Sequence, residues 1–383
     1  TCISLMTIGA EANRTERWEN TSLNVSGGYT NLSLYDKVFK SNVDWEKPVE
    51  SVNGTAVFRH KTSSSGMFKV YVTTDYGDLA YLVPAGNDGE KMKISSKGGT
   101  VYSNLSYRDC LSERSCYRIG VSSTYQDNRL GLGADDVNTK ELNIESRFAL
   151  VHDLSEGVKL TWGANETYNK YDQDYIENEG AVYNGSFDDH LLGAFIEPEI
   201  KFTKNFGIRP GLRTEYSSVI NKLNVAPRFA LALKTGEKAQ LSGAWGFYYQ
   251  TPQADYLKIN TDLDFEQAMH YILSYQFGDN SERLFRTEAY YKKYSDLITY
   301  SVGENGLPEN LLNDGSGYAA GFDIFWRDQL SIKGFDYWVT YSYIDTKRKY
   351  QYYPEKATPY FISDHNFSVV GKYWVNKINT QFG

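Results

Sequence analysis

The chain has 383 residues, a net charge of −8 and 15% aromatic residues. The negative charge argues against a nucleic-acid-binding surface, which needs clustered basic residues. The mean hydropathy of −0.52 fits a chain without membrane helices, and no stretch approaches the roughly eighteen consecutive apolar residues that such a helix needs. Strands that cross a membrane remain compatible with this composition, because each of them is only half apolar.

Alternating apolar and polar residues predict strands along the whole chain. The predicted strands are residues 1–11, 21–34, 52–62, 66–76, 99–108, 116–125, 140–151, 158–168, 190–203, 206–216, 224–234, 239–250, 267–277, 284–299, 318–328, 334–346, 363–373 and 377–383. Short connections such as Lys204-Asn205 alternate with mostly longer ones such as Gly77 to Gly98 and Asn169 to Asp189. Short turns at one rim and long loops at the other are typical of an up-and-down outer-membrane barrel. Two connections disturb the alternation, because Ala12 to Asn20 is long for a turn and Ser217 to Leu223 is short for a loop.

The clearest element is a hairpin between Asn224 and Thr251. On one face of its strands every residue is apolar or aromatic, apart from Gly243, and the other face mixes Arg228, Lys234 and small residues. Each strand runs for about ten residues, which exceeds the usual five to six of soluble proteins and matches the nine to eleven that cross a bilayer at a tilt. The hairpin therefore resembles one unit of a transmembrane barrel.

The same alternation collects charges of both signs on one face of the neighbouring strands. In a soluble sandwich this face is the exterior and the aromatic face is the core, whereas in a membrane barrel the aromatic face meets lipid and the charged face lines the lumen. Strand length, strand number and loop asymmetry favour the barrel over the sandwich. A propeller ranks lower still, because these strands are too long for blades. The predicted lumen-facing residues are Arg209, Arg213, Glu215, Arg228, Arg286 and Glu288.

The fold class is thus predicted as all-β, an antiparallel up-and-down transmembrane β-barrel. The strands number about 16 to 18, so the barrel is expected to be incomplete. The inward charges are expected to pair with one another or with a domain inside the barrel, or to be solvated by a wide pore.

Several segments of the second half resemble the barrel of TonB-dependent outer-membrane receptors, in the order that the family shows. These segments are Ile208-Arg-Pro-Gly-Leu-Arg-Thr-Glu-Tyr216, Asn224-Val-Ala-Pro-Arg-Phe229, Trp245-Gly-Phe-Tyr-Tyr-Gln-Thr-Pro252, Arg286-Thr-Glu-Ala-Tyr-Tyr-Lys-Lys-Tyr-Ser-Asp-Leu-Ile298, Gly315-Ser-Gly-Tyr-Ala-Ala-Gly-Phe-Asp323 and Asp364-His-Asn-Phe-Ser-Val369. The first half resembles the family in strand rhythm only. The resemblance implies a barrel of about twenty-two strands that is filled by an N-terminal plug domain. No plug, no energy-coupling segment and no terminal strand ending in an aromatic residue are recognised, so residues 1–383 are predicted to be a partial barrel domain.

The resemblance also implies a function and partners. It implies an integral protein of the outer membrane of a Gram-negative bacterium, which imports siderophore-bound iron, cobalamin, a glycan or a peptide. The implied partners are the receptor's own plug, a TonB energy-coupling complex, outer-membrane lipid and a small-molecule or oligosaccharide ligand, with a surface lipoprotein as a further candidate. No nucleic acid is expected. A passive porin, which needs no plug, is the alternative.

Tyr248 and Gln250 are the candidate ligand contacts, because they end a strand at the long-loop rim on the lumen side. Tyr249 shares the apolar face with Phe247 and is predicted to join an interfacial aromatic girdle instead. Further tyrosines in or beside the neighbouring loops could stack on a ligand or belong to the girdle. They are Tyr256, Tyr300, Tyr350, Tyr352 and Tyr353.

Motifs for catalysis, cofactors and metals are missing from the sequence. The 5 histidines are scattered, and no zinc-protease, nucleophile-elbow or phosphate-loop motif occurs, so no enzyme, cofactor or metal site is predicted. The acidic segment Tyr171 to His190 offers oxygen ligands, but its spacing matches no calcium loop and a solvated loop is preferred. Cys110 and Cys116 could form a disulfide across one turn or remain free thiols, and Cys2 has no candidate partner.

Overall fold

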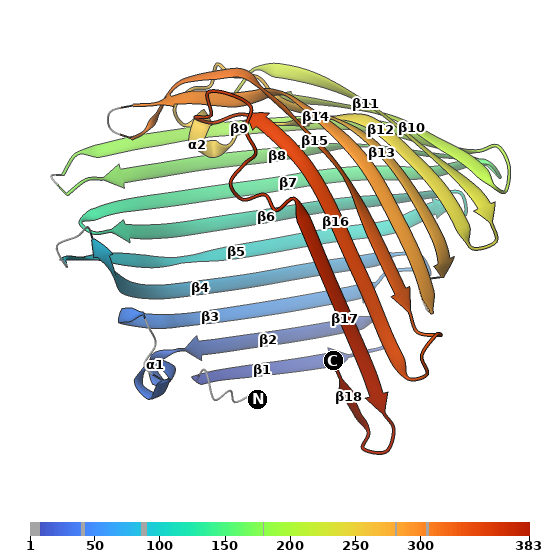
Figure 1. The fold of residues 1–383 in the computed structure, drawn as a ribbon, viewed down its shortest axis with the longest axis horizontal. Coiled ribbons are helices and arrows are strands. Elements are labelled where there is room, and N and C mark those ends of the chain that lie inside the picture. Colours follow the sequence, from blue (N-terminus) through green and yellow to red (C-terminus); the bar gives the residue numbers. More distant parts are fainter. Residues whose placement is uncertain (1–7, 40–42, 86–89, 179, 280–281, 304–305) are drawn as a thin grey trace. The chain divides into compact units, whose positions relative to one another are not determined.

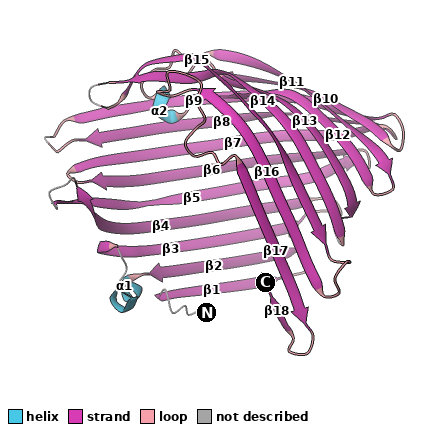
Figure 2. Ribbon diagram, viewed as in Figure 1, coloured by secondary structure: helices cyan, strands magenta, loops and turns pink. Residues whose placement is uncertain are grey.

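The computed structural model describes residues 8–39, 43–85, 90–178, 180–279, 282–303 and 306–383. Within these residues the chain is almost entirely extended, and the helices are α1 (Ser33–Phe39) and α2 (Ala254–Leu257), as Figure 2 shows. The strands are β1 (Ile8–Arg17), β2 (Thr21–Asn31), β3 (Asp44–Lys61), β4 (Met67–Ala85), β5 (Glu90–Ser112), β6 (Ser115–Leu132), β7 (Asp135–Ser155), β8 (Val158–Ile176), β9 (Val182–Lys201), β10 (Phe206–Ser217), β11 (Lys222–Gly236), β12 (Ala239–Gln250), β13 (Glu266–Asp279), β14 (Arg283–Val302), β15 (Pro308–Asp328), β16 (Phe335–Lys349), β17 (His365–Val375) and β18 (Thr380–Phe382). In this part of the chain, neither helix has the length and apolar composition needed to cross a membrane.

The strands form one 18-stranded sheet. Successive strands, such as β1 with β2 and β11 with β12, pair in the antiparallel orientation. The chain divides into two compact units, which are Thr1–His152 with Gly163–Gly193 and Tyr216–Val219, and Asp153–Trp162 with Ala194–Glu215 and Ile220–Gly383. In the first unit β1 to β6 lie side by side in sequence order (Figure 1). In the second unit β11 to β18 pair successively in the same way. The up-and-down antiparallel topology predicted from the sequence is confirmed.

The first strand differs from its prediction. Residues 1–7 of the expected strand 1–11 lie outside the described residues, and β1 runs on to Arg17. The connection to β2 is therefore a tight turn, in which the backbone N–H of Trp18 donates to the Thr21 carbonyl at 2.8 Å. The second half of β1 shows no alternation because charged residues lie on both of its faces. Its extended conformation is stabilised by hydrogen-bonded pairing with β2. The prediction of a long connection from Ala12 to Asn20 is wrong.

Most of the predicted long loops are also shorter than expected, because the strands run further. Gly77 pairs with Gly98 inside the β4–β5 hairpin, so that predicted loop is largely strand. The predicted loop Asn169 to Asp189 likewise contains the end of β8 and the start of β9, and the acidic segment Tyr171 to His190 is mostly extended. A strand that leaves the lipid need not have one apolar and one polar face. The end of β8 is mostly polar and Leu79 to Ala85 at the end of β4 are apolar on both faces, so neither shows the alternation that marks strands in the sequence. At the other end of the chain, the strand predicted for 377–383 is reduced to β18.

The short connection between β10 and β11 is held by a buried carboxylate of β9. Asp189 is 2% exposed, and its Oδ1 accepts hydrogen bonds from Ser217 Oγ at 2.9 Å and from Ser218 Oγ and the Val219 backbone N–H, both at 3.1 Å. These bonds satisfy a buried carboxyl oxygen and fix the connection in a compact form. The shortness of this loop, which disturbed the pattern in the sequence, therefore has a local cause.

The two faces of the sheet follow the predicted alternation. In the β11–β12 register Arg228 pairs with Gly246 on one face, and Phe229 pairs with Trp245 on the other. The apolar face is uncovered, since Leu273 is 55%, Phe277 46% and Leu105 43% exposed. A soluble sandwich would bury such residues in its core, so their exposure argues against the sandwich and fits contact with lipid.

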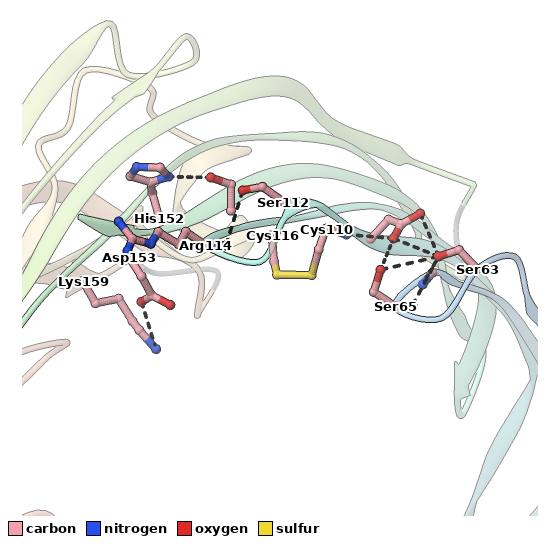
Figure 3. Close-up of a disulfide and its surroundings, with 12 residues drawn as sticks. Ser63, Ser65, Cys110, Ser112, Arg114, Cys116, His152, Asp153 and Lys159 are labelled. Atoms are coloured by element: carbon pink, nitrogen blue, oxygen red, sulfur yellow. Dashed lines mark hydrogen bonds and ion pairs between the residues drawn. A yellow bond between two sulfur atoms is a disulfide. The ribbon is translucent and has the colours of Figure 1, made fainter. Parts of the chain in front are cut away.

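A disulfide closes the β5–β6 hairpin, as Figure 3 shows. Cys110 and Cys116 occupy directly paired positions of the two strands and are bonded to each other. Of the two alternatives left open by the sequence, the structure has the disulfide. Cys2 lies outside the described residues.

Candidate functional site

The predicted lumen-facing residues lie on one face of the second unit, which we call the charged face. It consists of the side chains that share the orientation of Arg228 in β9 to β16. Most of the predicted charges form ion pairs there. The pairs are Arg209 with Glu199 at 2.8 Å, Arg213 with Glu215 at 2.8 Å and Arg286 with Glu288 at 3.6 Å.

These ion pairs differ in burial. Both side chains of the Arg213–Glu215 pair are largely covered, whereas Arg209 and Arg286 are more than half exposed. Exposed pairs contribute only about 0 to 1 kcal/mol to stability, so their main consequence is to hold charged groups in place along the face. The sequence does not single out Glu199. Its contact with Arg209 arises because β9 and β10 lie side by side, and no sequence spacing indicates it.

The fourth predicted cation, Arg228, belongs to a stack of side chains on three adjacent strands. Its guanidinium carbon lies 4.4 Å from the centre of the Tyr248 ring, and that ring stacks on His270 with centroids 4.4 Å apart. Gly246 separates Arg228 from His270 in the register, and a Cβ at this position would lie 2.9 Å from Arg228 Cγ. The glycine thus leaves the space that lets the arginine reach the tyrosine.

The stack changes how Tyr248 could contact a ligand. Arg228 and His270, from the strands on either side, both lie against its ring. A ligand that stacked on the tyrosine would have to displace one of them, so the phenolic hydroxyl is the group best placed for contact. The sequence does not predict the stack, because His270 is one of several scattered histidines. The alternation in β13 indicates only that His270 lies on the same polar face as Ser274 and Gln276.

Gln250, the other candidate contact, is exposed and is the last residue of β12. It pairs in the register with Glu266 at the start of β13. The Glu266 carboxylate is held by the backbone N–H of Ile298, which donates to its Oε1 at 3.1 Å. Gln250 therefore lies beside an ordered carboxylate at the rim, where its amide remains open to a ligand.

The rim tyrosines pack against one another. Tyr300 has ring centroids 5.9 Å from Tyr256 and 6.2 Å from Tyr352, and Tyr353 lies 5.2 Å from both Tyr350 and Tyr352. Tyr256 of α2 is 7% exposed, and burial raises the pKa of its hydroxyl to about 12. Tyr352 is 52% exposed. These residues form a packed cluster, which we call the rim cluster, and only part of it faces solvent.

Tyr249 lies on the apolar face, as the sequence indicated. Its hydroxyl accepts a hydrogen bond from Gln267 Nε2 at 2.9 Å, and its ring is 6.3 Å from Phe265. Its position on that face is the one that an interfacial girdle requires, with an apolar body and a hydrogen-bonded tip.

The charged face carries ion pairs, hydrogen-bonding groups and aromatic rings. Among the described residues no three His, Cys, Asp or Glu side chains gather as metal ligands do. Such a surface can bind and orient a solute or a protein segment by charge and hydrogen bonds. These side chains are suited to recognition, and their individual roles stay predictions.

Comparisons with known proteins give a consistent result. The family described as TonB dependent receptor-like, beta-barrel matches residues 7–383. No curated protein matches the sequence. The FrpB iron transporter from Neisseria meningitidis (F3-3 variant) superposes with a TM-score of 0.77 at 11% identity, over 98% of this chain and 66% of that protein.

Two further solved structures are similar. The ferric yersiniabactin uptake receptor FyuA from Yersinia pestis gives a TM-score of 0.72 at 11% identity, over 96% of this chain and 64% of that one. The outer membrane transporter YddB from Escherichia coli gives 0.68 at 13% identity, over 89% and 55%. At these identities the likeness shows a shared fold. The chain spans less than two thirds of the length of these proteins.

Proposed function

Because the chain belongs to the TonB-dependent receptor family, through its β-barrel domain, we propose that the protein imports a scarce or bulky nutrient across the outer membrane. The observation that carries this proposal is the family match over residues 7–383, on a sheet whose apolar face is exposed and whose opposite face is charged. An exposed apolar face fits lipid, and a charged face fits a water-filled or protein-filled lumen.

The proposed mechanism uses parts beyond this chain. A ligand is captured at the rim that carries Tyr248 and Gln250 and on the outer surface of a plug domain, and a TonB energy-coupling complex drives rearrangement of the plug. The ion pairs of the charged face hold Arg209, Arg213 and Arg286 in positions where a plug could contact them. These partners, like the outer-membrane location, come with the family and are proposals for this protein.

The ligand is proposed to be a metal chelate, a cobalamin, a glycan or a peptide. The similar structures include, by their names, an iron transporter and a siderophore receptor, which makes siderophore-bound iron the first ligand to test. Tyr248 is proposed to contact the ligand through its hydroxyl and Gln250 through its amide.

The experiment is an uptake assay in cells that express the full-length receptor, with and without an uncoupler of the proton gradient. Labelled iron-siderophore, cobalamin and oligosaccharide pools are compared. We expect accumulation of one pool that stops when the gradient is removed. Uptake that continues at the same rate would indicate a passive porin and reject the proposal.

A second measurement tests the site. The double variant Tyr248→Ala, Gln250→Ala is expected to weaken ligand binding to the full-length receptor by about tenfold, which corresponds to loss of about 1.4 kcal/mol of hydrogen bonding. Tyr249→Ala on the opposite face is the control and should leave the affinity unchanged. Equal affinity of the double variant and wild type would remove both residues from the site without affecting the family assignment.

A further inference from the structure

A cavity of about 710 Å³ is hollowed into the charged face beside the short turns that follow β9 and β11. Small side chains at neighbouring register positions form its floor, and this is why the wall is hollow there. They are Ala230, Ala232, Ser242, Ala244 and Ser274. The volume falls in the usual range of small-molecule sites, about 300 to 1,000 Å³.

The charges that line the cavity are unbalanced. It has four cationic side chains, Lys201, Lys204, Arg209 and Lys234, and two carboxylates, which leaves a net charge of +2. The Glu199 carboxylate already binds Arg209 at 2.8 Å and Lys201 at 3.6 Å. Two of the four cations therefore share one carboxylate, which neutralises one of their two charges.

The other two cations lie close together in the chain fold. The backbone N–H of Lys234 donates to the carbonyl of Asn205 at 2.8 Å, which places Lys234 beside the turn that contains Lys204. Within the residues that the structure describes, neither lysine forms an ion pair. Two of the lysines that line the cavity therefore lack a carboxylate partner among the described residues.

The neutral groups of the cavity also favour an anion. Gln240 Nε2 donates to Ser242 Oγ at 2.9 Å, so the Ser242 hydroxyl accepts this bond and keeps its own hydrogen free to donate. Ser274 pairs with Ser242 in the register and adds a second hydroxyl. Each of the two hydroxyls can donate one hydrogen bond to an anion.

We propose that this cavity binds a small dissolved anion with a carboxylate or phosphate group. Lys204 and Lys234 contact the charge, and the Ser242 and Ser274 hydroxyls donate to it. The cavity is lined by the charged face, opposite the exposed apolar face, so a solute rather than a lipid headgroup reaches it. The inference does not depend on which nutrient the receptor imports.

The test is calorimetric titration of the full-length receptor, in a neutral detergent at low salt, with inorganic phosphate and with citrate. We expect saturable binding of at least one of them, weakened about tenfold by Lys204→Gln or Lys234→Gln, since each variant loses a charge-assisted hydrogen bond. Ala232→Leu fills the hollow without changing charge and is expected to abolish binding. Circular dichroism and heat-dependent gel mobility confirm that each variant is folded.

The control is Lys69→Gln. Lys69 is an exposed lysine on the polar side of β4, three residues after the short β3–β4 turn, and does not line the cavity. It should bind both anions like wild type. The proposal is overturned if the full-length receptor binds neither anion. That result is expected if another segment of the receptor fills the cavity. Equal weakening by Lys69→Gln, or unchanged affinity of the Lys204→Gln, Lys234→Gln double variant, would overturn it as well.

Discussion

At the scale of single residues, Asp109 shows how one carboxylate ties two turns together. It precedes Cys110 near the end of β5, and its carboxylate accepts hydrogen bonds from Ser65 Oγ at 2.6 Å, Tyr107 Oη at 2.8 Å and Ser63 Oγ. These bonds, that from Ser65 above all, lower the pKa of Asp109 to about 2. Asp109 shares the apolar side of β5 with Tyr107, and a charge there lies beyond the lipid, beside the β3–β4 turn.

The lowered pKa predicts a pH-dependent contribution to stability. A carboxylate with a depressed folded-state pKa stabilises the fold above its unfolded pKa, near 3.8, and loses this effect as the pH falls towards about 2. Asp109→Asn should therefore lower the thermal unfolding midpoint at pH 7, and the difference from wild type should shrink between about pH 4 and pH 2. Thermal unfolding in detergent, followed by circular dichroism, measures it. Asp127→Asn, at an exposed position of β6, is the control. A difference that stays constant down to pH 2 would contradict the assignment.

At the scale of elements, the connection between β12 and β13, residues 251–265, is a packed segment that contains α2; we call it the α2 segment. Tyr256, Leu257, Leu263 and Phe265 are all nearly fully buried. Lys222 Nζ binds Asp264 Oδ1 at 3.1 Å and ties this segment to the start of β11. A long connection can be ordered in this way because its apolar side chains are buried against the rest of the rim, as the ring contacts of Tyr256 with Tyr300 and of Phe265 with Tyr249 show.

Removing the buried Tyr256 ring should destabilise the α2 segment. Tyr256→Ala is expected to cost about 3 kcal/mol of local stability, through lost packing and the cavity left behind. Limited proteolysis with mass spectrometry should then show faster cleavage within 251–265. Tyr256→Phe keeps the ring and should stay close to wild type. Tyr352→Ala, at the half-exposed end of the rim cluster, should have a much smaller effect. Equal cleavage of Tyr256→Ala and wild type would show that α2 does not hold the segment.

At the scale of the whole molecule, the two faces of the sheet differ in polarity and are therefore suited to different surroundings, lipid on one side and water or protein on the other. The exposed apolar residues and the ion-paired charges lie on opposite faces of the same strands. This is the reverse of a soluble sheet, whose apolar face is covered. The family match agrees with this arrangement.

A pair of reciprocal substitutions tests the orientation. Phe247→Arg places a charge on the lipid face and should cost about 2 to 4 kcal/mol at mid-membrane and little near the interface. Arg213→Phe on the charged face breaks an ion pair with Glu215 and is expected to cost less. Both are measured by urea titration of folding into lipid vesicles. A larger cost for Arg213→Phe would invert the assignment of the faces.

The sequence by itself determined the class of fold, the alternation of faces and the positions of the strands within the lipid. The reason is physical: a strand with lipid on one side and water or protein on the other must alternate with period two, and this pattern is local. The alternation alone predicts that Arg228 and Phe229 lie on opposite faces, and the β11–β12 register confirms it. The resemblance to the family came from short segments of the same strands.

Only the tertiary structure decided how far the strands run and which side chains meet. The end of β8 and the start of β9 are mostly polar, and Leu79 to Ala85 at the end of β4 are apolar on both faces. None of these ends shows a period of two, and they are held by pairing with their neighbours. The contact of Glu199 with Arg209 and the stack of Arg228, Tyr248 and His270 depend on the register between strands. Register arises from turns and hydrogen bonds between segments distant in the chain, and for that reason no single stretch of sequence contains it.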